Sequence, residues 1–119
     1  MVIDDERIWW PFDLSPRGHS NLELQVKATF LESAYRDGFR SYVQRDDCGA
    51  VSSEGMEVVL VWRGRGRTEL LLIRGSTVED RKLFTDASEG KAFRQASAEA
   101  LDWLRSSTIS RESIGSDQN

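Results

Sequence analysis

The sequence has 119 residues, of which 39% are hydrophobic and 30% charged, and its net charge at pH 7 is −4. This length suits a single domain, which we expect to occupy residues 1–106, followed by a disordered Ser-rich tail over 107–119. The longest apolar run, 58–62, is too short to cross a membrane, so we expect no membrane association. The single cysteine excludes an internal disulfide, and the acidic first residues do not look like an export signal. We therefore expect a cytoplasmic protein.

Residues 1–20 are predicted to form an N-terminal aromatic arm and loop. Trp9, Trp10 and Phe12 surround Pro11, which excludes a central strand because proline has no N–H to donate. Exposed aromatic side chains are common anchors of protein interfaces. The same rings could instead seal one face or edge of a sheet, and both alternatives stay open.

Residues 22–30 alternate between apolar and polar side chains, which is typical of a strand with one buried face. A helix is the alternative, because Ser20 and Glu23 have the spacing of a capping box and Gly38 could end a helix. We favour the strand, since the apolar residues do not form one stripe on a helical wheel.

Asp37 and Gly38 form the pair that two-residue hairpin turns prefer. Residues 46–55 are rich in Asp, Gly and Ser and are predicted to be a loop. The segment 57–62 is apolar and β-branched, and Gly64 and Gly66 allow a tight turn after it. The strands predicted after the turn at Gly38 are 39–45, 57–62, 68–73 and an edge strand at 81–84.

The last predicted element is a helix over 86–106, whose apolar residues recur every three or four positions. The chain is therefore predicted to be an α+β, two-layer domain. An antiparallel meander sheet of four to five strands is covered on one face by the C-terminal α-helix. The other face of the sheet is solvated, covered by the aromatic arm, or used for binding.

Six basic residues lie between positions 63 and 82 of this acidic chain. The first three alternate with glycine directly after Trp62, and Arg-Gly turns beside an aromatic ring occur in single-strand nucleic-acid contacts. A solvated turn and a site for an acidic protein are the alternatives. The residues concerned are Arg63, Arg65, Arg67, Arg74, Arg81 and Lys82.

Cys48 and His19 are each unique and could form a thiol–imidazole pair. Asp46 and Asp47 flank the cysteine, and their negative charge would raise its pKa and weaken the thiolate. The acidic residues lack the spacing of a calcium loop. We therefore predict no catalytic site, no metal site and no cofactor.

The sequence favours a non-catalytic protein-interaction module, such as a small adaptor, inhibitor or regulatory subunit, that is a monomer or a weak homodimer. The partner would bind the exposed sheet face or edge and the arm, through Trp9, Trp10, Phe12, Arg63, Arg65 and Arg67. A nucleic-acid-binding module is the first alternative and a small thiol enzyme the second.

Overall fold

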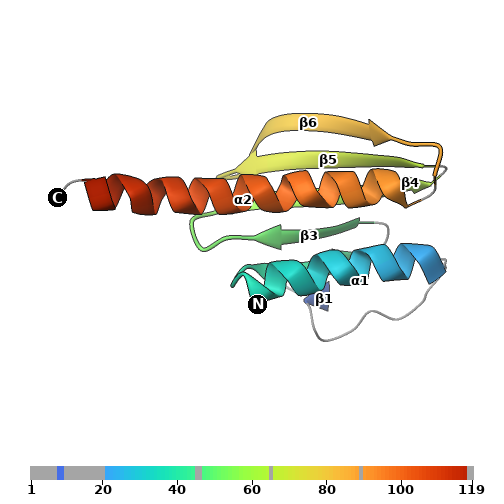
Figure 1. The fold of residues 1–119 in the computed structure, drawn as a ribbon, viewed down its shortest axis with the longest axis horizontal. Coiled ribbons are helices and arrows are strands. Elements are labelled where there is room, and N and C mark those ends of the chain that lie inside the picture. The colour runs from blue at the N-terminus through green and yellow to red at the C-terminus, as the bar shows by residue number, and fades with distance from the viewer. Residues whose placement is uncertain (1–7, 10–20, 45–46, 65, 89, 118–119) are drawn as a thin grey trace.

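A computed structural model of the chain describes residues 8–9, 21–44, 47–64, 66–88 and 90–117. Six strands form one antiparallel sheet in the order β1-β2-β3-β4-β5-β6, and two helices lie side by side on one of its faces (Figure 1). The elements are β1 (Ile8–Trp9), α1 (Asn21–Arg36), β2 (Arg40–Gln44), β3 (Asp47–Val51), β4 (Met56–Gly64), β5 (Arg67–Arg74), β6 (Thr77–Thr85) and α2 (Lys91–Asp117). The predicted α+β class, with a meander sheet and a C-terminal helix, is confirmed.

The hairpin of β4 and β5 is confirmed, with the predicted strands 57–62 and 68–73 inside it. The predicted strand 39–45 corresponds to β2, and the predicted edge strand 81–84 is the C-terminal half of β6. Successive strands from β2 onward are neighbours in the sheet, since short connections can join only antiparallel strands.

The strand predicted over 22–30 is wrong, because this segment is part of α1. The helix buries residues at a three- and four-residue spacing, as expected of a helix face. Two of them are charged, and Lys27 Nζ lies 2.7 Å from Glu23 Oε2. These two charges interrupt the apolar stripe, which is why the helical pattern was missed. The buried positions of α1 are Glu23, Val26, Lys27, Phe30, Leu31 and Ala34.

The turn predicted at Asp37 and Gly38 is also wrong as a hairpin, because these residues end α1. Gly38 has φ +89°, and its N–H donates to the Tyr35 carbonyl at 3.0 Å. The Phe39 N–H donates to the Ala34 carbonyl at 3.1 Å. This pair of bonds is a Schellman cap, which needs the left-handed backbone that glycine adopts readily.

The loop predicted over 46–55 contains a strand, β3. Its side chains are small because both faces are tightly packed. Cys48 and Ala50 are fully buried on the helix-covered face. A Cβ at Gly49 would collide on the opposite face with the ring of Tyr42 and with the Val58 carbonyl. A strand of small residues lacks the β-branched signature on which the prediction depended.

The C-terminal helix differs from its predicted bounds at both ends. It begins at Lys91 instead of residue 86, and it continues to Asp117 through most of the predicted disordered tail. A helix that is already nucleated gains one hydrogen bond for each added residue, so polar sequence can extend it. Its C-terminal turns project past the strands (Figure 1). Residues 118–119 lie outside the described part of the chain.

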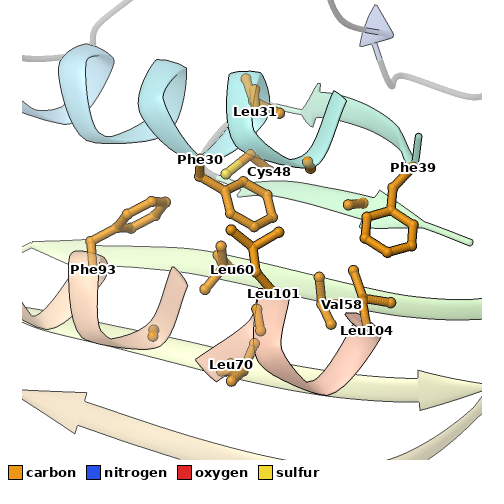
Figure 2. Close-up of a cluster of buried hydrophobic side chains, with 14 of the residues drawn as sticks. Phe30, Leu31, Phe39, Cys48, Val58, Leu60, Leu70, Phe93, Leu101 and Leu104 are labelled. Carbon is orange, nitrogen blue, oxygen red and sulfur yellow. The ribbon is translucent and has the colours of Figure 1, made fainter. Parts of the chain in front are cut away.

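The core lies between the two helices and the sheet (Figure 2). Phe30 from α1 and Phe93 from α2 are fully buried against Leu60 of β4. Because side chains alternate along a strand, the neighbours Val59 and Val61 point to the opposite side. We call this opposite side, which neither α1 nor α2 covers, the second face.

Candidate interaction surface

The second face can be followed strand by strand from the pairing register. One row crosses the whole sheet, with successive residues directly opposite one another. Cross-strand partners point to the same side of a sheet, so these side chains share the second face. The row consists of Trp9, Tyr42, Gly49, Val59, Leu71 and Arg81.

The β1 end of this face is closed. Tyr42 is only 1% exposed, and its ring lies over Gly49. Its hydroxyl reaches β4 and donates to Glu57 Oε2 at 2.5 Å. Trp9 packs edge-on against the Tyr42 ring, with 5.3 Å between centroids, and the Arg40 guanidinium lies 4.3 Å above Trp9. This end of the face is therefore built as a second small core.

The predicted aromatic arm is only partly described. Trp9 is half-buried in the contact with Tyr42, which agrees with the sealing alternative for that ring. Trp10 and Phe12 lie outside the described residues, and their predicted role in binding stays a prediction.

The β6 end of the second face is open. Val78 is 49% exposed and Leu83 is 61% exposed. On β5, Ile73 lies directly opposite Val78, and Leu71 lies diagonal to Leu83; both are half-buried. We call these four residues the β6 patch. An exposed group of large apolar side chains is a feature of docking surfaces.

Sequence reasoning missed Val78 and Leu83 because five positions separate them, which would place them on opposite faces of a regular strand. The register between β5 and β6 shifts at this point: Leu72 is opposite Asp80, but Ile73 is opposite Val78. Glu79 is the extra residue of a β-bulge, and a bulge of this kind redirects the side chains on one side of it. The acidic and basic block 79–82 within the strand was the only signal of an irregular edge.

Charged side chains border the β6 patch. The Arg63 Nη2 lies 2.6 Å from Glu69 Oε1, and the Arg81 Nε lies 3.3 Å from Glu69 Oε2. The Glu69 side chain is 16% exposed, whereas those of Arg63 and Arg81 are 53% and 64% exposed. The carboxylate thus lies beneath the two guanidinium groups. Arg67 is exposed at the start of β5, and Arg65 lies outside the described residues.

The other two predicted basic residues lie on the helix-covered side of the sheet. Arg74 makes two hydrogen bonds to Glu79, at 2.8 and 3.3 Å, and lies 5.5 Å from the Trp103 ring of α2. Lys82 pairs with Glu99 of α2. The hydrogen bond to the carboxylate raises the pKa of each cation. The predicted basic group is therefore divided between two faces of the sheet.

Cys48 lies beneath α1 and is fully buried. Burial raises the pKa of its thiol from 9.0 to about 12, and nearby Lys27 offsets only part of that rise. A neutral, inaccessible thiol is a poor nucleophile. His19, its proposed partner, lies outside the described residues.

A groove of about 230 Å³ lies between α1 and α2. Its floor is apolar, and the residues lining it are Val26, Thr29, Phe30, Ser33, Arg94, Ser97 and Leu101. Within the described segments, no group of three or more His, Cys, Asp or Glu side chains is placed to hold a metal ion. None of the helices described here has the length and apolarity needed to span a membrane.

The chain matches no family model, no curated protein and no solved structure.

Proposed function

We propose that the chain is a non-catalytic protein-interaction module that binds its partner through the β6 patch. The observation that carries this proposal is the exposure of Leu83 and Val78 on one face, next to Leu71 and Ile73. When a partner covers exposed apolar surface, the complex is stabilised by about 25 cal/mol for each Å² removed from water. Large contiguous apolar patches on small proteins commonly mark docking sites.

We place the contact at the β6 end of the sheet instead of the β1 end. Trp9 is engaged by Tyr42 and Arg40, so its surface is already used within the domain. The partner would instead meet Val78 and Leu83, with Arg63, Arg67 and Arg81 at the border. Trp10, Phe12 and Arg65 stay proposed contacts.

The face of β6 is a better docking surface than its edge. Four consecutive charged residues, 79–82, occupy the strand, and a bulge interrupts it at Glu79. Charges and bulges on an edge strand oppose the addition of another strand. A side-chain contact across the face avoids both obstacles.

The ion pairs of the basic residues, and the faces on which these residues lie, favour a protein partner over nucleic acid. Arg63, Arg74 and Arg81 each have a carboxylate partner, as does Lys82. Arg74 and Lys82 make their pairs on the helix-covered side, so the basic residues do not form one surface that could follow a phosphate backbone. We also propose a cytoplasmic location, because the buried free thiol of Cys48 suits a reducing compartment. A monomeric or weakly dimeric state is part of the same proposal.

Site-specific photo-cross-linking in the native cell tests the proposal. A benzophenone amino acid is introduced in place of Leu83 in one variant and in place of Tyr35 in another. Tyr35 is the matched control, since it is 55% exposed but lies on α1. We expect a discrete cross-linked protein from position 83 and none from position 35.

The same cross-linked species from both positions would contradict docking at the β6 patch, because it would show non-specific contact. The absence of any cross-linked protein at position 83 would contradict the proposal itself. Both variants must first give the wild-type circular dichroism spectrum.

A further inference from the structure

We infer that the partner presents carboxylates beside its apolar contact residues, so that acidic groups meet Arg67 and Arg81 as Leu83 and Val78 become buried. This inference rests on the proposed function and names the chemistry of the partner. It follows from which charged side chains around the β6 patch are exposed to an approaching molecule.

The exposed charge at the Leu83 end of the patch comes from Arg63, Arg67 and Arg81, although the chain as a whole is acidic and Glu57 lies beside Ile73 at the other end. Glu69 lies opposite Leu83 in the register, but its side chain is covered by the arginines on either side of it. An approaching molecule therefore meets guanidinium groups before it meets the carboxylate. Interfaces favour such complementary charges because they steer encounter and exclude partners with the same sign.

Arg67 and Arg81 have guanidinium N–H groups that can donate hydrogen bonds to a partner. Arg81 meets Glu69 through Nε, and its side chain is largely exposed. Arg67 is exposed and enters no ion pair with the side chains described in 66–88 or in the other described segments. A guanidinium has five N–H donors in a planar fork that fits a carboxylate with two parallel hydrogen bonds.

The surroundings of these arginines suit a protein better than a nucleic acid. Single-strand binding uses exposed aromatic rings on which bases stack. Trp62, the ring next to the Arg-Gly turn, packs on the helix-covered side against Phe93, with 5.8 Å between centroids. Leu71 and Leu83 lie beside Arg81 on the second face. Their side chains would contact apolar residues of a protein partner.

Selection from a displayed random-sequence peptide library tests the inference. On the wild-type protein, we expect enrichment of peptides that combine Asp or Glu with large apolar residues. A selected peptide should bind the Arg67→Ala/Arg81→Ala variant about tenfold more weakly, as expected for lost charge-assisted hydrogen bonds. Its affinity for the wild type should also fall as salt is added.

The Arg36→Ala/Arg94→Ala variant is the charge-matched control. Both of its arginines are exposed on the helices, and it also loses two positive charges. This variant should bind the selected peptide with wild-type affinity. Equal weakening in both variants would overturn the inference, because it would indicate a general effect of net charge.

The remaining outcomes separate the inference from the proposed function. Selected peptides that lack acidic residues and lose binding on Leu83→Asp would overturn the inference and leave the proposed function standing. Failure to select any peptide that depends on Leu83 would overturn both. Binding of a fluorescein-labelled oligothymidylate that is lost in Arg67→Ala/Arg81→Ala would overturn both in favour of nucleic acid.

Discussion

The two ends of the sheet are built differently. At the β1 end, α1 covers one face and the Trp9 and Tyr42 rings close the other. At the β6 end, α2 covers one face, whereas Val78 and Leu83 leave the other open. Residues of similar hydrophobicity therefore stabilise the fold at one end and are exposed to solvent at the other. Burial, not residue type, distinguishes the two ends.

The ion pairs follow the same division. In the buried pair of α1, the Lys27 side chain is 0% exposed and that of Glu23 is 7% exposed. The Arg74–Glu79 pair near β6 is about half exposed on both sides. Removing one member of a buried pair leaves a charge in a poorly solvated place, whereas an exposed charge returns to water.

The largest expected effect comes from breaking the buried pair. Lys27→Met keeps most of the length of the side chain but removes the charge that faces Glu23. We expect the free energy of unfolding to fall by about 3–5 kcal/mol, as found for buried pairs that lose one partner. Urea denaturation followed by circular dichroism measures this change.

A double variant sharpens that prediction. Glu23→Gln/Lys27→Met removes both charges, so it should be more stable than Lys27→Met alone. The explanation would be wrong if the double variant were the less stable of the two. In that case the packing of the lysine's methylene groups, and not its charge, would account for the loss of stability.

The next effect tests the close approach at the β1 end. Gly49→Ala places a methyl group where the Tyr42 ring and the Val58 carbonyl already lie. Overpacking of this kind costs about 1–3 kcal/mol. Differential scanning calorimetry should show a clear drop in Tm, and an unchanged Tm would mean that Tyr42 is not held over Gly49.

Stability should also depend on pH through Cys48. Burial raises the pKa of the thiol from 9.0 to about 12 in the folded protein. Between these values the unfolded chain loses the thiol proton and the folded chain keeps it, so stability falls as pH rises, by up to about 1.4 kcal/mol per pH unit. The slope should be shallower in Cys48→Ala, and equal slopes in both proteins would contradict a buried neutral thiol.

The smallest expected effect on stability is at the β6 patch. Leu83→Ser exchanges an exposed apolar side chain for a polar one, so the free energy of unfolding should stay within about 0.5 kcal/mol of wild type. Urea denaturation would be the measurement. A loss as large as that of Gly49→Ala would show that Leu83 belongs to the core.

Part of the fold follows from local pattern. The β-branched run 57–62 and the glycines after it are sufficient to predict the β4–β5 hairpin, and the apolar spacing of 92–104 predicts α2. The pattern failed where tertiary contacts decide the structure. Lys27 and Glu23 are buried because they pair with each other, and Gly49 is in a strand because Tyr42 covers it.

The candidate surface was predictable only in part. Arg63, Arg67 and Arg81 follow from composition and spacing, and their role in binding stays a prediction. The carboxylate of Glu69 beneath two of them does not follow, since it depends on the pairing of β4, β5 and β6. The exposure of Val78 and Leu83 on one face depends on a bulge that only the charged block 79–82 signals in the sequence.

Hydroxyl-radical footprinting of the free protein tests most directly the claim that the second face is closed at one end and open at the other. The two tyrosines give an internal comparison, because Tyr35 is exposed and Tyr42 is buried. We predict rapid oxidation of Tyr35 and Leu83, with Tyr42 protected. Oxidation of Tyr42 as fast as Tyr35, or protection of Leu83 in the monomer, would contradict the account.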